Sequence, residues 1–319
     1  MSFGISRLDL ETGPSTREAF GEALAEAGAN ERIVVCDGDV NNSTYTNKFA
    51  ERHPERFFNV GIAESNLIGI ASGLASSGKI PVAASFSIFL LANAFDQIRM
   101  SIAFPNLNVK LVGTHAGISI GEDGPSQMAI EDVALACALP GFRVIVPADG
   151  PSTAAATHAM IERDGPTFLR CGRPNVPIVY TDGREWHLGK ATKMRDGADV
   201  TIIANGIMVA MALDASEGLA AEGISARVLD MHTVKPVDVA AIERAANETK
   251  GIVVAEEHLA YGGLGATVSM VVSERSPTRM AFVDLGDTYA TSGKPDELLA
   301  QFGLTPDAII DAARRVLKD

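Results

Sequence analysis

The chain has 319 residues, 46% of them hydrophobic and 21% charged, which is enough for two domains with sizeable cores. A formal net charge of −13 argues against nucleic acid as a partner, because such proteins need clustered lysine and arginine. The three cysteines show no CxxC spacing and are expected to pack as small apolar side chains. The N-terminus has no signal-peptide core, and no apolar run is long enough to span a bilayer. We therefore expect a cytoplasmic protein with no membrane contact.

In the first half of the chain, strand-like apolar stretches alternate with helical patterns. Ser15 or Thr16 can cap a helix that runs to about Gly28, with Glu18 in its first turn. Further helices are expected at 64–77, 89–103, 129–138 and 152–163, and a polar loop at 41–47. Strands are expected at 33–40, 57–62, 80–86, 108–115, 142–149 and 166–171. This alternation predicts an α/β fold, a doubly wound parallel sheet with helices on both faces.

A proline-rich polar stretch at 174–187 predicts a linker, and a second α/β set follows it. We therefore divide the chain into a first domain at 1–175, a linker at 176–188 and a second domain at 189–319. The second domain is expected to have strands at 199–206, 226–232, 251–257 and 280–286, and helices at 208–222, 237–248, 263–273 and 305–317. Two further segments, 232–236 and 256–258, are polar and loop-like, with a structural or interfacial role.

Glu64 stands where a glycine-containing turn meets a helix of small and apolar residues. A glutamate at a helix start usually just favours the helix dipole. The competing interpretation is a carboxyl that stays protonated in a dry pocket and exchanges a proton with a ligand nitrogen. Phe86 and Phe89 follow a strand. Their spacing alone favours core packing, but the carboxyl ends of parallel strands are where such sheets bind ligands.

A glycine-rich loop at 117–125 either lets the backbone approach a ligand closely or forms an ordinary surface turn. Within it, Asp123 can accept a hydrogen bond from a ligand hydroxyl or simply form the turn. His115 at a strand end is more often structural when taken alone, and so are Arg17 and Arg170. If the two arginines converge, they make a bidentate anion site.

The stretch CDGDVNN at 36–42 superficially resembles a signature that binds magnesium and a diphosphate. In that signature roughly a helix and a strand separate the GDG part from the NN part, whereas here the asparagines follow at once. No other group of His, Cys or carboxylates has metal-ligand spacing. We therefore expect no metal site on this chain.

Seven motifs follow one another along the chain: STREAF, GDVNNS, NVGIAESN, SFSIF, THAGISIGEDGPS, PAD and FLRCGRP. Together they resemble the carboxy-terminal half of transketolase, a pyrimidine-binding domain and a terminal domain, over essentially the whole chain. The diphosphate-binding domain that precedes them in a full-length transketolase is not in this sequence. The resemblance implies the β subunit of a split, two-chain transketolase, which transfers a two-carbon ketol unit from a ketose phosphate to an aldose acceptor.

The resemblance also implies roles for residues at matching positions. Glu64 matches the glutamate that bonds the aminopyrimidine nitrogen of thiamine diphosphate, so that the imino form can take the thiazolium proton. Phe86 and Phe89 match aromatic residues against the pyrimidine, and Asp39 matches an aspartate on the thiazolium side. The residues implied to hold the sugar phosphate or to read a sugar hydroxyl are Arg17, Ser43, His115, Arg170 and Asp123.

Two positions depart from the family pattern. Gln127 replaces a histidine that contacts the donor sugar and the covalent intermediate, and an amide forms hydrogen bonds but cannot carry a proton. We group Gln127 with Glu64 and His115 as catalytic candidates, and this replacement points to a specialised sugar phosphate as substrate. Ala92 replaces the third aromatic residue, a tyrosine, so we expect a less aromatic pyrimidine pocket.

The resemblance implies partners as well. Thiamine diphosphate would lie between this chain and an α subunit whose diphosphate-binding domain holds the Mg²⁺, and self-association through the pyrimidine domains would give an α2β2 assembly. The small residues on the helix after Glu64 are compatible with such self-association. Two alternatives stay open: the β subunit of a 2-oxoacid dehydrogenase E1, and a non-catalytic partner subunit.

Overall fold

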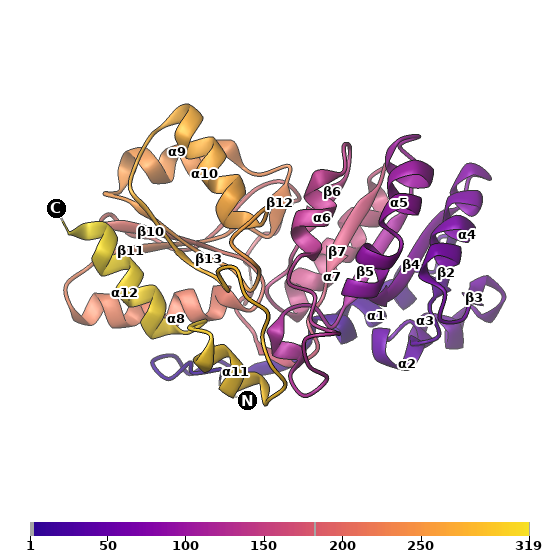
Figure 1. The fold of residues 1–319 in the computed structure, drawn as a ribbon, viewed down its shortest axis with the longest axis horizontal. Helices are drawn as coiled ribbons and strands as arrows, with labels where there is room; N and C mark the ends of the chain where they lie inside the picture. The colour runs from indigo at the N-terminus through magenta and orange to yellow at the C-terminus, as the bar shows by residue number, and fades with distance from the viewer. Residues whose placement is uncertain (1–2, 182, 319) are drawn as a thin grey trace.

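The computed structural model describes residues 3–181 and 183–318, which form two α/β units side by side (Figure 1). The first unit holds a seven-stranded sheet with the strand order β12 (Thr233–Lys235), β6 (Arg143–Ile145), β7 (Thr167–Arg170), β5 (Lys110–Thr114), β4 (Ile80–Phe86), β2 (Ile33–Asp37) and β3 (Phe57–Asn59). All neighbouring strands in it are parallel except β12 and β6. No helix in the two described ranges is long and apolar enough to cross a bilayer.

Helices cover both faces of this sheet. One apolar cluster packs α1 (Thr16–Ala27), α3 (Asn47–Arg52) and α7 (Gly150–Glu162) on one face. A second cluster packs α4 (Glu64–Ser76), α5 (Phe95–Ile98) and α6 (Asp132–Ala138) on the other face. The doubly wound α/β fold expected from the sequence is therefore confirmed. Ser15 caps α1 as expected, because its Oγ accepts a hydrogen bond from the amide of Glu18 at 3.3 Å.

The second unit repeats the same architecture. Its five-stranded sheet has the order β14 (Met280–Val283), β13 (Ile252–Ala255), β10 (Val200–Ala204), β11 (Ala226–Asp230) and β9 (Thr192–Arg195), of which only β9 is antiparallel. In Figure 1, α9 (Val239–Glu248) and α10 (Leu264–Arg275) lie above this sheet, and α8 (Met208–Ala221) and α12 (Pro306–Leu317) lie below it. The helix α11 (Pro295–Gln301) lies at the lower edge, towards the first unit.

The segment 232–236, expected to be loop-like, contains the strand β12. This strand crosses to the first sheet and pairs antiparallel with β6. Two contacts explain the difference. Val234 is buried in the apolar cluster, and Lys235 donates from its Nζ to the carbonyls of Cys137 and Leu139 at 2.7 and 2.6 Å, at the end of α6. The Lys235 side chain therefore satisfies backbone carbonyls of the first unit.

The expected polar loop at 41–47 is also wrong, because it forms α2 (Asn41–Thr44) and begins α3. The hydroxyl groups of Thr44 and Thr46 turn inward towards the fully buried Asp37. The Oγ1 atoms of Thr44 and Thr46 donate to Asp37 Oδ2 at 2.7 and 2.8 Å, and the amide of Val40 donates to Oδ1 at 2.7 Å. A buried carboxylate needs such partners, so the polar sequence folds around it.

Smaller differences concern short elements. The single helix expected at 89–103 is interrupted: two π-helical turns, η2 (Phe89–Asn93) and η3 (Arg99–Ala103), flank α5. Residues at the border of the expected linker form β8 (Asn175–Pro177), which pairs with β1 (Thr12–Ser15). The 3₁₀ turns are η1 (Pro54–Arg56) and η4 (Ile118–Ile120).

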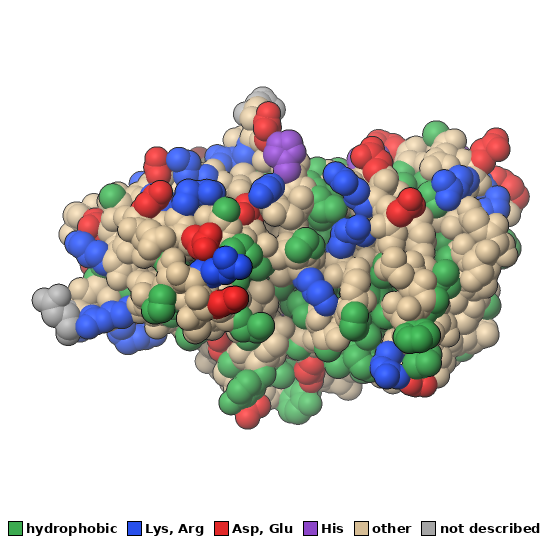
Figure 2. All heavy atoms as spheres, turned by 90° about the horizontal axis from the view of Figure 1, so that it is seen from above, with side chains coloured by type: hydrophobic (Ala, Val, Ile, Leu, Met, Phe, Trp, Pro, Cys, Tyr) green, Lys and Arg blue, Asp and Glu red, His purple; other side chains and the backbone are tan. Residues whose placement is uncertain are grey.

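Charged side chains of both signs are intermixed over both units on the face drawn in Figure 2. The net charge of −13 is therefore not concentrated in a single acidic patch on that face. This distribution leaves room for local basic groups to bind an anion in spite of the overall charge.

Asp149 fixes the connection between the two units. Its Oδ1 accepts from the amide of Ser152 at 2.9 Å and so caps α7. Its Oδ2 accepts from the amides of Val179 and Tyr180, at 2.8 and 2.7 Å, where the chain leaves the first unit. Asp149 is fully buried, so all three amides depend on this one carboxylate.

Replacing Asp149 with alanine should lower the free energy of unfolding by about 3 kcal/mol, because a helix cap is lost and buried amides lose their acceptor. Thr305 is the N-cap of α12 and the matched control, because in the described residues its side chain accepts from one amide, that of Ala308. Thr305→Ala should cost about 1 kcal/mol. Urea denaturation measures both variants, and equal losses would contradict the double role of Asp149.

Candidate active site

Most of the residues singled out from the sequence lie along one edge of the first sheet. This edge is formed by the carboxyl ends of β2, β4, β5 and β7, where parallel sheets bind ligands. Phe86 ends β4, His115 follows β5, and Arg170 ends β7. The chain order of the strands and the parallel register thus bring together residues that are far apart in the sequence.

Glu64 is the first residue of α4, and 8% of its surface is exposed. Ser85 in β4 donates from its Oγ to Glu64 Oε1 at 3.5 Å, so the carboxyl lies beside the end of that strand. Gly61, with a φ of +75°, makes the turn that leads into the helix. The carboxyl is therefore held at a helix start, almost without water, next to the residue that precedes Phe86.

Three rings stack on one another where β4 and β5 end. Phe86 and Phe89 are nearly parallel, with an interplanar angle of 11° and centroids 6.2 Å apart. The ring of His115 stacks on Phe86 at 3.8 Å and 19°. An aromatic surface beside a shielded carboxyl fits an aminopyrimidine, because the rings can pack against its plane and the carboxyl can bond a ring nitrogen.

His115 is a neutral imidazole in this structure. Arg17 donates from Nη1 to His115 Nε2 at 3.1 Å, so Nε2 carries no proton. Nδ1 then donates to Thr114 Oγ1 at 2.8 Å, a tautomer assigned from these bonds. Burial, together with the charges of Arg17 and Arg173, lowers the pKa of His115 to about 3. Its φ of +59° lies in the left-handed region, which is strained for a histidine.

Arg17, in the first turn of α1, is held by the backbone. It donates from Nη1 to the carbonyl of Ser43 at 2.8 Å and from Nε to the carbonyl of Arg173 at 3.3 Å. Its guanidinium also lies over the ring of Tyr45, 5.2 Å from the centroid. Burial and the nearby Arg173 lower the pKa of Arg17. A bound anion would relieve this repulsion between the two arginines.

The arginine that accompanies Arg17 is Arg173, which the prediction from sequence did not include. Arg173 donates from Nη1 to the carbonyl of Ile120 at 2.7 Å and contacts Glu122 at 3.4 Å. A groove of about 430 Å³ is lined by Thr12, Arg17, Ser119, Ile120, Glu122, Arg173, Pro174, Asn175 and Pro295. The signal was present in the motif FLRCGRP, which contains two arginines three positions apart.

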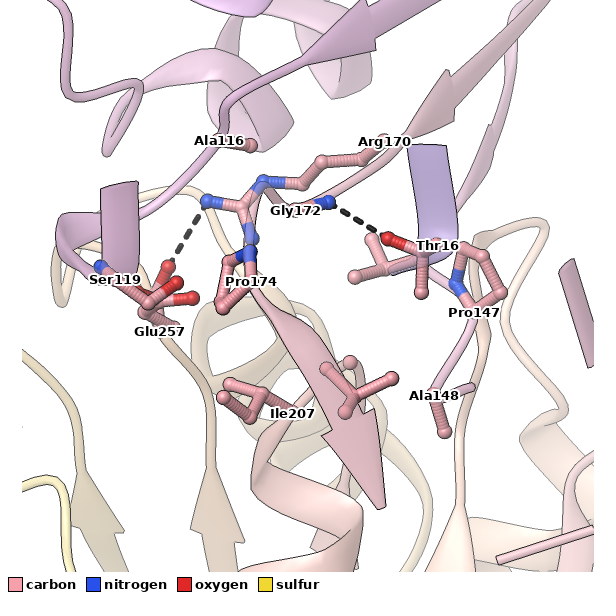
Figure 3. A pocket seen from close by; sticks show the side chains of 13 residues that line it. Thr16, Ala116, Ser119, Pro147, Ala148, Arg170, Gly172, Pro174, Ile207 and Glu257 are labelled. Carbon is pink, nitrogen blue, oxygen red and sulfur yellow. Dashed lines mark hydrogen bonds between the residues drawn. The ribbon is translucent and has the colours of Figure 1, made fainter. Parts of the chain in front are cut away.

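The structure does not bring Arg170 and Arg17 together in this groove. Arg170 is buried and donates from Nε to both carboxylate oxygens of Asp132, at 3.0 and 2.9 Å. Its Nη2 donates to the carbonyl of Ala129 at 2.9 Å and to that of Glu257 at 3.0 Å. Figure 3 shows Arg170 and Glu257. Burial acts to lower the pKa of Arg170, but the carboxylates of Asp132 and Glu257 outweigh it and raise the pKa. Its side chain is thus committed to the protein interior.

The other candidates are less buried. Asp39 is exposed and accepts from Asn59 Nδ2 at 2.6 Å. Asp123 is exposed on the glycine-rich loop, and Gln127 is half-buried at the end of the same loop and bonded to Ser126. The described residues bring no three His, Cys, Asp or Glu side chains together in a metal-binding group.

Comparison with protein families gives two matches. Residues 12–179 match the pyrimidine binding domain of transketolase. Residues 189–309 match the transketolase C-terminal domain. The two matches together cover most of the chain.

Individual relatives agree with these matches. The chain is 41% identical over 307 residues to a transketolase C-terminal section of Methanocaldococcus jannaschii, which covers 95% of both chains. It is 40% identical over 301 residues to the 6-deoxy-6-sulfo-D-fructose transketolase subunit SqwH of a Clostridium species, covering 94% of both. A solved structure described as a split gene transketolase, an inactive beta4 tetramer, is 45% identical, with a TM-score of 0.90 over 96% of this chain and 99% of that one.

Replacing Arg17 with methionine should raise the pKa of His115, because the variant removes one neighbouring cation and the donor to Nε2. In the unaltered chain, ¹⁵N NMR of the histidines should find His115 neutral down to about pH 5. The unfolded chain binds this proton more readily, so the stability due to His115 is complete above pH 6.5 and is lost as the pH falls towards 3. Protonation of His115 near its ordinary pKa of 6.5 would refute the assignment.

Proposed function

This chain belongs to the transketolase family, and on that premise we propose that it is the β subunit of a two-chain, thiamine-diphosphate-dependent transketolase. It would help transfer a two-carbon ketol unit from a ketose phosphate to an aldose acceptor. The pyrimidine-binding domain would occupy residues 1–175 and the terminal domain residues 189–319. The observation that carries the proposal is the buried Glu64 carboxyl beside Phe86, at the same sheet edge as a groove with two arginines.

Thiamine diphosphate, when bound, supplies the carbon nucleophile that opens the C2–C3 bond of the ketose and holds the two-carbon unit. Glu64 would share a proton with the aminopyrimidine nitrogen, and its low exposure would keep water from competing for that proton. Phe86 and Phe89 would pack against the pyrimidine ring. Asp39 would lie on the thiazolium side.

The groove would bind the phosphate of the sugar. Arg17 and Arg173 supply two guanidinium groups in the groove, which suit an anion. His115, which accepts from Arg17, and the hydroxyl of Ser43 would add polar contacts. We propose Arg173 as a further phosphate contact, and the same role for Arg170 stays a prediction from the sequence. Asp123 would accept a hydrogen bond from a sugar hydroxyl.

Gln127 would act on the donor side of the same site. Its amide can hold a sugar hydroxyl by hydrogen bonds without exchanging a proton. We therefore keep a specialised sugar phosphate as the proposed substrate. A relative that is 40% identical and named for 6-deoxy-6-sulfo-D-fructose indicates that modified sugars occur as substrates in this family.

Activity would need a second chain. A relative described as a beta4 tetramer is also described as inactive, and another is named as a C-terminal section. We propose an α subunit that binds the diphosphate and the Mg²⁺, in an α2β2 assembly in the cytoplasm. The open side of α4 supports self-association. Among the described residues, a Cβ atom added at Gly69 or Gly73 would meet no neighbour within 4 Å, and Ile62 before this helix is 79% exposed.

Glu64→Gln should reduce ketol transfer by the assembled enzyme about 100-fold or more, because the amide cannot share the proton. The thermal unfolding of the chain should change little. Glu51→Gln, at an exposed carboxyl on α3, is the control and should leave the rate unchanged. An unimpaired Glu64→Gln enzyme would favour a scaffold role for this chain.

Arg173→Met should raise the KM for a phosphorylated aldose about tenfold or more, because one of two guanidinium partners of the phosphate is lost. The kcat should fall less than the affinity. Arg143→Met is the matched control. Arg143 begins β6 and donates to the carbonyl of Asp164 at the amino ends of the strands, away from the groove. Steady-state kinetics with phosphorylated and unphosphorylated acceptors measure the effect, and an equal loss with both would argue against a phosphate contact.

A further inference from the structure

The polar segment 256–258 follows β13 in the second unit and lies against the glycine-rich loop of the first. Glu257 is buried, and its Oε1 accepts from the amide of Ser119 at 2.6 Å. Its backbone carbonyl accepts from Arg170 Nη2. Figure 3 shows Glu257 between Ser119 and Arg170, beside a small cavity of about 30 Å³. The amide of Ser119 thus has its acceptor in the other unit.

The loop fits closely around this carboxylate. A Cβ atom on Gly117 would collide with the carboxyl group of Glu257, and Gly117 has a φ of +82°. Ser119 is itself buried, so its amide cannot turn to water if Glu257 withdraws. Glycine at 117 therefore allows an approach that any side chain would block.

The second unit supports the rest of the loop as well. A Cβ atom on Gly124 would collide with Ser292 Oγ, and one on Gly121 would lie 3.0 Å from Pro295. The loop carries Asp123, and it lines the two-arginine groove through Ser119, Ile120 and Glu122. Contacts made by the second unit thus set the position of one wall of the groove.

We propose that Glu257 is a positioning residue for sugar-phosphate binding: its carboxylate holds the Ser119 amide and so fixes the loop that walls the groove beside Arg17 and Arg173. This inference rests on the proposed function. It gives the second unit a defined part in substrate affinity, although in the described residues it contributes only Pro295 to the groove lining.

Glu256 is a matched control. It is as buried as Glu257, but its two oxygens accept from the amides of Leu264 and Gly265, at 2.8 and 2.7 Å, at the start of α10. Removing this carboxylate disturbs the second unit without touching the groove. Comparing variants of Glu256 and Glu257 therefore distinguishes a general loss of stability from a displacement of the loop.

The test compares three variants in the chain assembled with its diphosphate-domain partner. Glu257→Met keeps the side-chain volume but removes the acceptor, and the KM for a phosphorylated aldose should rise about tenfold with a smaller change in kcat. Glu257→Gln keeps an oxygen acceptor and should restore most of the affinity. Glu256→Met should leave the KM within about twofold, even where the melting temperature falls.

Hydrogen exchange of this chain on its own provides a second readout. The peptide spanning 117–121 should exchange slowly in the unaltered chain and faster in Glu257→Met, but not in Glu256→Met. Rapid exchange of this peptide in the unaltered chain, or an unchanged KM in Glu257→Met, would overturn the inference. If the unaltered assembly performs no ketol transfer, the proposed function fails, while the exchange experiment still decides whether Glu257 holds the loop.

Discussion

The buried guanidinium of Arg170 links the parts on which the site depends. A buried cation must be paired, and Arg170 meets that need with the carboxylate of Asp132 and the carbonyls of Ala129 and Glu257. These partners come from the start of α6, the loop before it and the segment after β13. One side chain therefore joins β7 of the first unit to the second unit. Breaking such a buried pair from one side costs about 3–5 kcal/mol.

The carboxylate of Asp132 also links this network to the residue that follows Phe86. Asp132 Oδ2 also accepts from Ser87 Oγ at 2.7 Å, and Ser87 directly follows Phe86 at the end of β4. The position of Phe86 thus depends on the same buried network as the contact between the units. Arg173, three residues beyond Arg170, lies outside this network and lines the groove. Arg170 thus stabilises the contact between the two units, whereas Arg173 lines the groove.

Local patterns in the sequence were sufficient for the alternation of strands and helices, for the cap at Ser15 and for the family. They failed where the partner of a residue is distant in the chain. The strand β12 depends on β6 and on the carbonyls that end α6. The helix α2 is a different case, because Asp37 is only seven residues from Thr44 but its complete burial, which makes it need hydroxyl partners, is a property of the folded sheet. The different surroundings of Arg170 and Arg173 could not be predicted from FLRCGRP alone. They depend on where Asp132 and Glu257 lie in space, which spacing does not encode.

The strand β12 has a consequence for the side of the first sheet that ends at β6. An edge strand offers unpaired backbone groups to any other chain, and β12 covers that edge at β6. In the chain, β12 lies between β11 and α9 of the second unit, so the second unit supplies the strand that covers this side of the first sheet. If a protease cut the chain between the units and they separated, the first unit would not remain a soluble, non-aggregating domain. The first unit would keep β6 as an outer strand, unpaired on one side, between apolar residues, and such a strand can pair with other chains and aggregate.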